Sequence, residues 1–221
     1  MKWYLDFGHG GKDPGAIGPT NLKESDIVLK IGMMIKETLE NAFEKVMTTR
    51  ENDKYYSLDY RSSKANKENC DYFVSIHMNS ATNKSAKGVE VWVYDEKSKV
   101  YNLAKDICSN LSKALNTPNR GVKISKSFSV LRKTKMPSLL IEIDFISNLS
   151  VENYLKDETY IHDIAQSISN SLLSFVNKPI INSPSYSVCI GEFKDFSSAV
   201  KLKNIAISKG FADTFIVNQY L

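Results

Sequence analysis

Segments with the periodicity of a β-strand alternate with segments of helical periodicity along the first 176 residues of this 221-residue chain. Residues 2–7 predict a strand that runs into a glycine-rich loop, whereas apolar residues after Glu24 recur at helical spacing. Strands are predicted at residues 2–7, 45–49, 72–77, 88–94, 128–131 and 139–143, and helices at 24–39, 57–69, 98–115 and 161–175. This alternation predicts an α/β fold with a mostly parallel, twisted sheet covered by helices. Ligand sites in such folds gather at the carboxyl ends of the strands.

The chain is expected to divide after residue 176. Residues 177–184 contain two prolines and are typical of a linker. Residues 185–221 predict a β-α-β module with strands at 186–190 and 213–217 and a helix at 197–208. A module of this size buries little core, so we expect it to pack on a partner or on the first domain.

Composition indicates an ordinary globular protein without a nucleic-acid partner. The formal charge of +4 comes from acidic and basic residues mixed along the chain, with no long basic run. The cysteines Cys70, Cys108 and Cys189 are widely spaced and form no C-x-x-C pair, which favours free thiols in a reducing cytosol. No stretch reaches the ~18 apolar residues of a membrane span. The first residues also lack the apolar region of a signal peptide, so we expect synthesis in the cytoplasm.

Two of the three histidines stand where predicted strands end. His9 follows the first strand inside a glycine-rich loop, and His77 ends the third. One such histidine is usually a hydrogen-bonded bystander, but two beside glycines that permit close approach favour a metal site. A catalytic zinc needs a third protein ligand, and His-His-Glu is a known set. Glu24, at the start of the first helix, fits that role; attraction of a carboxylate to the helix dipole explains its position equally well.

Glu142 lies within a very apolar predicted strand. A carboxylate there is costly unless it is paired or functional. One interpretation is a structural ion pair with Arg61 or Arg132, and the other is a catalytic acid or base beside the metal. A purely structural zinc would need a fourth protein ligand, and the remaining histidine, His162, is predicted on the surface of the last helix.

Four ordered blocks of residues carry a resemblance to a known family. They are residues 6–16, Glu24, residues 61–66 leading into 71–79, and residues 130–132 followed by 136–148. On these blocks the chain resembles the type 3 N-acetylmuramoyl-L-alanine amidases over roughly residues 1–176. The resemblance implies a zinc-dependent hydrolase that cuts the amide bond between N-acetylmuramic acid and L-alanine in bacterial peptidoglycan.

The resemblance also assigns roles to individual residues. It implies three Zn²⁺ ligands, namely His9, Glu24 and His77. It implies that Glu142 is the catalytic acid/base. It further implies substrate contacts at three positions, namely Asn79, Arg132 and Asp144.

The chain departs from the family pattern at three positions. Phe7 stands where the family usually has proline, Cys70 stands near a usual alanine, and Asp144 stands where glycine is usual. Asp144 adds a carboxylate two residues after Glu142, and repulsion between two close carboxylates would raise the pKa of one of them.

Residues 185–221 resemble the first half of a SPOR repeat, a module that binds peptidoglycan. The usual domain has two β-α-β halves and this chain has one, so two tails are expected to pair and give a homodimer. A cytosolic start, a catalytic domain and a wall-binding tail together predict a bacteriolytic endolysin of a phage or prophage, released to the cell wall through a holin. A sporulation or autolytic amidase of the host is the alternative setting, and a non-catalytic wall-binding protein is the alternative function.

Overall fold

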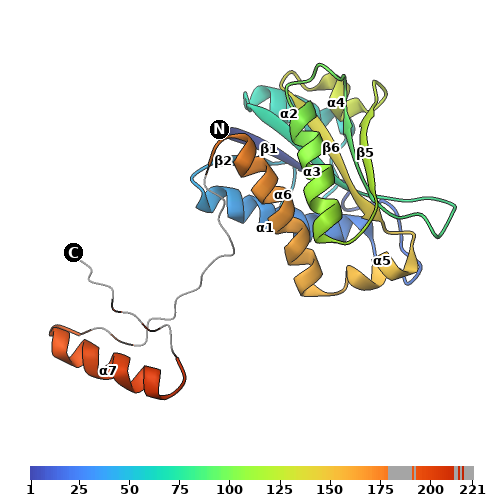
Figure 1. The fold of residues 1–221 in the computed structure, drawn as a ribbon. Coiled ribbons are helices and arrows are strands. Elements are labelled where there is room, and N and C mark those ends of the chain that lie inside the picture. The colour runs from blue at the N-terminus through green and yellow to red at the C-terminus, as the bar shows by residue number, and fades with distance from the viewer. Residues whose placement is uncertain (179–190, 192, 212–213, 215, 217–221) are drawn as a thin grey trace. The chain divides into compact units, whose positions relative to one another are not determined.

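The computed structural model describes residues 1–178, 191, 193–211, 214 and 216. The chain divides into two compact units, Met1–Asn182 and Ser183–Leu221. The first unit holds the sheet and six of the helices, and the described part of the second holds one helix (Figure 1). Within the described residues, no helix is long and apolar enough to cross a membrane.

A six-stranded sheet in the order β2-β1-β3-β6-β4-β5 forms the centre of the first unit (Figure 1). Its strands are β1 Lys2–Phe7, β2 Lys45–Thr48, β3 Tyr72–Asn79, β4 Val89–Val93, β5 Asn119–Ile124 and β6 Ser138–Phe145. The strands β2, β1, β3 and β6 run parallel to one another, β4 runs antiparallel to β6, and β5 runs parallel to β4. The predicted α/β fold with a mostly parallel sheet is confirmed.

Helices cover both faces of this sheet. They are α1 Glu24–Asn41, α2 Leu58–Lys67, α3 Tyr101–Ala114, α4 Ser129–Lys133, α5 Leu149–Tyr154 and α6 Glu158–Phe175. Side chains of β1 alternate between two cores: Trp3 and Leu5 join the larger core with α1, α3 and α6, whereas Tyr4 joins the smaller core. The smaller core also holds Ala65 of α2 and Leu131 of α4. This alternation follows from the two-residue period of a strand.

Three short elements differ from the sequence-based prediction, one of them the unpredicted helix α5. Residues 128–131 were predicted as a strand from their β-branched and aromatic content, but the chain forms helix α4 there. Val130 and Leu131 are buried on this helix, so tertiary packing outweighs local preference. The prediction also missed β5, because this edge strand is polar and contains a glycine with positive φ at Gly121.

The second unit contains α7, Phe196–Ser208, which confirms the predicted helix of the tail. Asp195 caps this helix by accepting a hydrogen bond from the backbone N–H of Ser198. The predicted strand at 186–190 lies outside the described residues, as does most of the one at 213–217. Cys189 also lies outside them, whereas Cys70 and Cys108 are buried free thiols as predicted.

Candidate metal centre and active site

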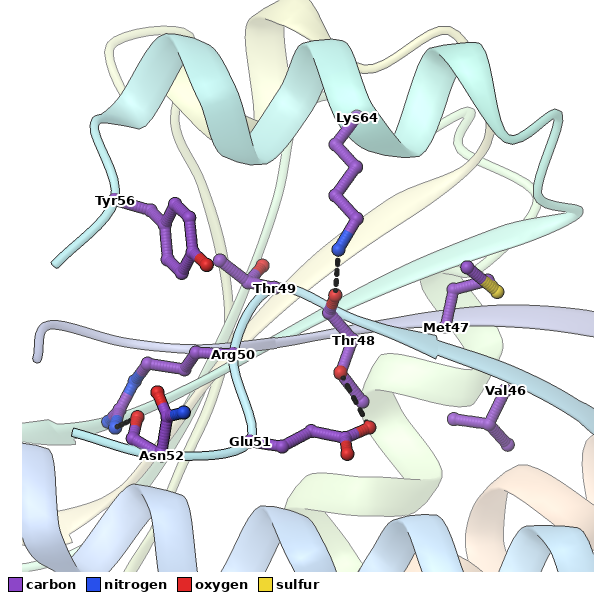
Figure 2. A pocket seen from close by; sticks show the side chains of 9 residues that line it. All are labelled: Val46, Met47, Thr48, Thr49, Arg50, Glu51, Asn52, Tyr56 and Lys64. Atoms are coloured by element: carbon purple, nitrogen blue, oxygen red, sulfur yellow. Dashed lines mark hydrogen bonds between the residues drawn. The ribbon is translucent and has the colours of Figure 1, made fainter. Parts of the chain in front are cut away.

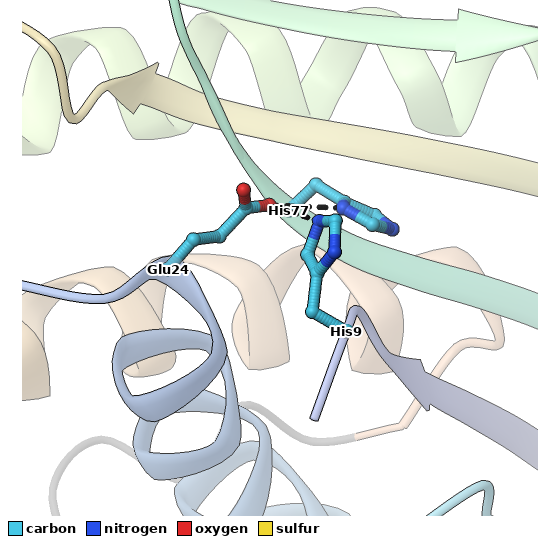
Figure 3. A group of neighbouring side chains, drawn as sticks. All are labelled: His9, Glu24 and His77. Atoms are coloured by element: carbon cyan, nitrogen blue, oxygen red, sulfur yellow. Dashed lines mark hydrogen bonds and ion pairs between the residues drawn. The ribbon is translucent and has the colours of Figure 1, made fainter. Parts of the chain in front are cut away.

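Two adjacent strands and helix α1 bring His9, Glu24 and His77 together at the carboxyl edge of the sheet (Figure 3). β1 and β3 pair in parallel, so His9, just after β1, lies beside His77 near the end of β3. The two imidazole rings meet edge to face, with centroids 4.9 Å apart. Glu24 is the first residue of α1 and points its carboxylate between them (Figure 3).

The Glu24 carboxylate is held by both histidines and by backbone N–H groups. Its Oε1 lies 3.1 Å from Nε2 of His9 and 3.0 Å from Nδ1 of His77. The backbone N–H of Met78 donates to the same oxygen, and that of Ala16 donates to Oε2. Burial opposes ionisation of Glu24, but hydrogen bonds from His77 and His9 outweigh it and hold its pKa well below the usual value.

The geometry of these three side chains fits a divalent metal ion. One ligand atom from each residue lies within 4.8 Å of the others, and both histidine side chains are partly open to solvent. Two imidazole nitrogens and one carboxylate oxygen form a donor set typical of a catalytic zinc site, which keeps a further position open. Oδ2 of Asp13 lies 2.9 Å from Nδ1 of His9, the kind of contact that orients a metal-binding imidazole.

Glycines in the loop after β1 make room for this cluster. Gly15 has a φ of +68°, and a Cβ there would lie 2.6 Å from both Oε2 of Glu24 and Cδ2 of His9. A Cβ on Gly8 would come within 2.3 Å of the His77 ring. Only glycine therefore fits at these two positions.

Two buried arginines hold the backbone of the same loop. Arg50 donates to the carbonyl oxygens of Phe7, Gly8 and Ser25. Arg61 donates to the carbonyl oxygens of Phe7 and His9. Each guanidinium therefore fixes the chain next to a candidate ligand.

Arg61 forms its ion pair with Asp6, at 2.8 Å, and not with Glu142. Ser75 and Thr49 donate hydrogen bonds to the same carboxylate. The pKa of Asp6 is lowered, because Arg61 and these hydroxyls outweigh the cost of burial. The alternative interpretation of Glu142 as a structural partner of Arg61 is thereby corrected.

Glu142 lies on β6 directly beside His77 of β3. Its Oε2 is buried and accepts no hydrogen bond from the described residues. Burial raises the pKa of Glu142 to about 7, and the negative charges of Glu24 and Glu90 add to this effect. A carboxyl group with this pKa can both accept and donate a proton near neutral pH.

The sequence-based prediction missed Glu90. This residue lies opposite Glu142 in the antiparallel β4–β6 pair. Its carboxylate accepts hydrogen bonds from Nε of Arg120, at 2.6 Å, and from Nδ2 of Asn79, at 3.2 Å. The one available signal is a glutamate between valines in the alternating run at 89–93, which does not reveal the strand beside it.

The three predicted substrate contacts have different positions. Asn79 is half-buried at the end of β3, next to Glu90. Arg132 is exposed on α4 and donates weakly to the carbonyl oxygen of Lys126. Asn79 lies two residues beyond the candidate ligand His77 on β3. Arg132 instead lies near Lys126 and Tyr94, beyond the ends of β5 and β4, at the edge of the sheet opposite His77.

Asp144 does not fit the expected substrate contact. Its side chain is buried, and its oxygens accept hydrogen bonds from the backbone N–H of Gly88 and the hydroxyl of Thr117. The β3–β6 register shifts by one residue between His77 and Asn79, which breaks the alternation that would place Asp144 on the face of Glu142. In this structure Asp144 instead binds the backbone N–H of Gly88, just before β4, and the side-chain hydroxyl of Thr117, just before β5.

A hollow of about 290 Å³ lies at the end of β2 (Figure 2). Its lining is mostly polar and includes Thr48, Arg50, Asn52, Tyr56 and Lys64. None of the candidate ligands lines it, so the hollow and the metal centre are separate features.

Comparison with known proteins finds matches over most of this chain. Residues 4–174 match a protein family described as N-acetylmuramoyl-L-alanine amidase. A sporulation-specific N-acetylmuramoyl-L-alanine amidase of Bacillus subtilis (strain 168) is 36% identical over 215 residues, covering 96% of this chain and 82% of that protein. The endolysin of Bacillus phage SPP1 is 35% identical over 181 residues, covering 79% of this chain and 65% of the endolysin. The solved structure of the amidase AmiC2 of Nostoc punctiforme has a TM-score of 0.75 at 33% identity, covering 80% of this chain and 97% of AmiC2.

Proposed function

The chain belongs to the N-acetylmuramoyl-L-alanine amidase family, and from this premise we propose that it degrades peptidoglycan with a zinc ion held by His9, Glu24 and His77. The bond cut is the amide between the lactyl group of N-acetylmuramic acid and L-alanine. One observation carries the zinc-dependent part of the proposal. The three ligand atoms lie within 4.8 Å of one another, beside a glutamate whose Oε2 has no hydrogen-bond partner among the described residues.

Hydrolysis of an amide near neutral pH needs an activated water and a proton for the leaving nitrogen. Zinc, when bound, acts as a Lewis acid toward water and toward the scissile carbonyl. Glu142 accepts a proton from the attacking water and donates it to the alanine nitrogen as the C–N bond breaks. The products are a carboxylate on the lactyl group and a free amino terminus on the peptide.

Other residues position the three candidate ligands and Glu142. Asp13 orients His9, while Arg50 and Arg61 fix the carbonyl oxygens of the loop that carries it. Glu90 is itself held by Arg120 and places a negative charge opposite Glu142. This charge favours the protonated form of Glu142, the form that donates to the leaving nitrogen.

Asn79 and Arg132 are proposed to contact the substrate. Asn79 offers an amide group two residues beyond His77, on the side of the site that faces Glu90. Arg132 offers an exposed cation on α4. An anionic group on the stem peptide would suit that cation, because a guanidinium binds carboxylates through paired N–H groups.

The tail is proposed to bind peptidoglycan as a half-SPOR module, and pairing of two tails stays a prediction. Helix α7 is the described element on which this proposal rests. Light scattering on the full-length protein measures the mass in solution. A monomer whose tail still sediments with cell-wall sacculi would defeat the homodimer.

The comparisons bear on the biological setting. The match to the sporulation-specific amidase covers 96% of the chain and extends into the tail, whereas the match to the phage endolysin covers 79%. This difference favours a host sporulation or autolytic amidase over the predicted endolysin. Cytoplasmic synthesis followed by release to the wall at cell lysis fits either setting and is proposed for this chain. Expression timing distinguishes the two, because an endolysin is produced with phage late genes and a sporulation amidase in sporulating cells.

Removal and return of the metal tests the zinc proposal. The full-length protein treated with a chelator is expected to lose amidase activity and to regain it with one equivalent of zinc. His77→Ala and His9→Ala should bind less zinc in the same titration, whereas His162→Ala, on α6, should bind as much as the parent. Full activity without bound zinc would overturn the proposal.

A further inference from the structure

An exposed tyrosine-rich segment follows β2 at the same edge of the sheet as the metal centre. β1 and β2 are parallel neighbours, so the residues after both strands meet at one edge. His9 follows β1, and the tyrosines Tyr55, Tyr56 and Tyr60 follow β2. These three residues are called the tyrosine platform below.

The rings of the tyrosine platform are exposed and are accompanied by positive charge. Tyr55 is 40% exposed and Tyr60 is 38% exposed, and Tyr56 stacks on Tyr60 with centroids 4.4 Å apart. Lys12, Lys54 and Lys64 place their ammonium groups over Tyr55, Tyr56 and Tyr60 respectively. Among the described residues, none of these three lysines forms an ion pair with a carboxylate. A contiguous exposed aromatic patch, unlike a single exposed ring, is a candidate binding surface.

The tyrosine platform is fixed relative to the metal centre. Arg61 donates from Nε to the carbonyl oxygen of Tyr56, at 3.2 Å, and from Nη2 to that of His9, at 2.8 Å. The backbone N–H of Gly11 donates to Oδ1 of Asp53, and a Cβ on Gly11 would lie 2.8 Å from the backbone nitrogen of Tyr55. The segment and the ligand loop are therefore packed backbone to backbone.

The polar hollow at the end of β2 continues this surface. Tyr56 of the tyrosine platform and Lys64, which lies over Tyr60, also line the hollow (Figure 2). Thr48 and Asn52 add hydrogen-bonding groups to that lining. Apolar ring faces and hydrogen-bonding groups thus lie side by side, next to unpaired cations.

We propose that the tyrosine platform and this hollow form a glycan subsite that binds the saccharide strand of peptidoglycan beside the scissile amide. The proposal rests on the proposed function, since it names the part of the same substrate that lies next to the metal centre. A pyranose ring has a face of C–H groups and an edge of hydroxyls. Exposed tyrosine rings match the face, because they offer rigid contact area with a polar tip, and the groups of the hollow match the edge.

The unpaired lysines favour a particular stretch of that strand. Each hydrolysis leaves a carboxylate on the lactyl group, so a strand that has already lost peptides is anionic. Lys12 and Lys54 would attract that product stretch, while the next intact muramoyl unit lies at the metal. The observations favour a glycan over a nucleic acid, because the formal charge of +4 is spread along the chain with no long basic run.

Kinetics on soluble glycan-peptide strands of defined length test the glycan subsite. The full-length zinc-loaded protein would be assayed on a single disaccharide-peptide and on strands of four or more disaccharides. Tyr55→Ala and Tyr60→Ala are expected to raise KM on the long strands about tenfold, with a much smaller change in kcat. Tyr94→Ala is the matched control: Tyr94 is 38% exposed beneath Lys126, but it follows β4 at the opposite edge of the sheet.

The outcomes separate this proposal from the proposed function. A parental KM on long strands in both tyrosine variants would overturn the glycan subsite while leaving the amidase intact. An equal rise in KM for Tyr94→Ala would also overturn it, because the effect would then not depend on position. A parent protein that releases no amine from any strand would defeat the proposed function itself. Thermal unfolding of each variant establishes that the fold is retained.

Discussion

Oδ2 of Asp13 lies 2.9 Å from Nδ1 of His9, and this contact leaves Nε2 of His9 facing the Glu24 carboxylate at 3.1 Å. One ring nitrogen is thereby engaged outside the metal centre and the other points into it. A carboxylate behind an imidazole fixes its tautomer and raises its basicity as a ligand. The contact between Asp13 and His9 explains how a histidine in a glycine-rich loop can present a fixed donor atom to a metal.

Replacing Asp13 is predicted to weaken zinc binding without unfolding the protein. Asp13→Ala should lower zinc affinity about 10–100-fold, because the His9 ring loses its orienting partner. Asp13→Asn keeps an oxygen that can accept from Nδ1 and should lose less. Competition with a chromophoric chelator measures both affinities. A parental affinity in Asp13→Ala would show that the contact does not orient the ligand.

Gly15→Ala is predicted to disturb the metal centre directly. The added Cβ would lie 2.6 Å from Glu24 and from His9, so both candidate ligands must move. Zinc affinity should fall at least about tenfold. Gly121→Ala is the matched control: Gly121 also has a positive φ, but a Cβ there meets nothing within 4 Å. The control should cost about 1–2 kcal/mol of stability and leave zinc affinity unchanged; an equal loss of affinity in both variants would contradict the steric argument.

Arg61→Ala is predicted to destabilise the fold by about 3–5 kcal/mol, because it leaves the buried carboxylate of Asp6 without its cation. It also removes the hydrogen bonds to the carbonyl oxygens of Phe7 and His9. Lys133→Ala removes an exposed ion pair with Asp59 and should cost less than about 1 kcal/mol. Denaturant unfolding monitored by circular dichroism compares the two. Losses of similar size would contradict the role assigned to Arg61.

Glu142→Gln is predicted to change how the stability of the metal-free protein depends on pH. The folded-state pKa of Glu142 is raised to about 7 from an ordinary value of 4.5. Stability from the protonated carboxyl is fully present below the ordinary pKa and is lost as pH rises through about 7. The glutamine does not titrate, so Glu142→Gln should not lose this stability. The free energy of unfolding of Glu142→Gln, minus that of the parent, should therefore rise by up to about 3 kcal/mol from acidic to mildly alkaline pH. A constant difference across that range would mean that Glu142 titrates normally.

The sequence predicts most of the sheet, and the meeting of His9 and His77 at one edge of it, because both depend on local patterns. The role of Glu24 as a third ligand rests on the family resemblance and stays a prediction. Buried parallel strands give apolar β-branched runs in the sequence. The glycines that flank His9, together with Gly15, mark a loop that approaches other groups closely. Five residues such as those of α4 carry no helical period, so that element could not be predicted. β5 is a polar edge strand and resembles a loop.

The contacts that tune the site depend on register, which no local pattern encodes. Glu90 meets Glu142 because β4 runs antiparallel to β6, and the sequence shows neither the direction nor the pairing. Asp144 was expected near Glu142 from its spacing of two residues, but a one-residue register shift turns it toward Gly88 and Thr117. Arg50 holds the ligand loop through carbonyl oxygens, and a pattern of side chains does not reveal such bonds.

The most direct test of the account measures the products released from purified peptidoglycan by the parent and by Glu142→Gln, each loaded with zinc. The parent is predicted to release new amino-terminal alanine without new reducing sugar ends. Glu142→Gln should bind zinc as the parent does and lose about 100- to 10,000-fold in rate, because the proton carrier is gone. New reducing ends from the parent would mean a glycosidase, and full activity in Glu142→Gln would contradict the role of Glu142 in an amide-cleaving site.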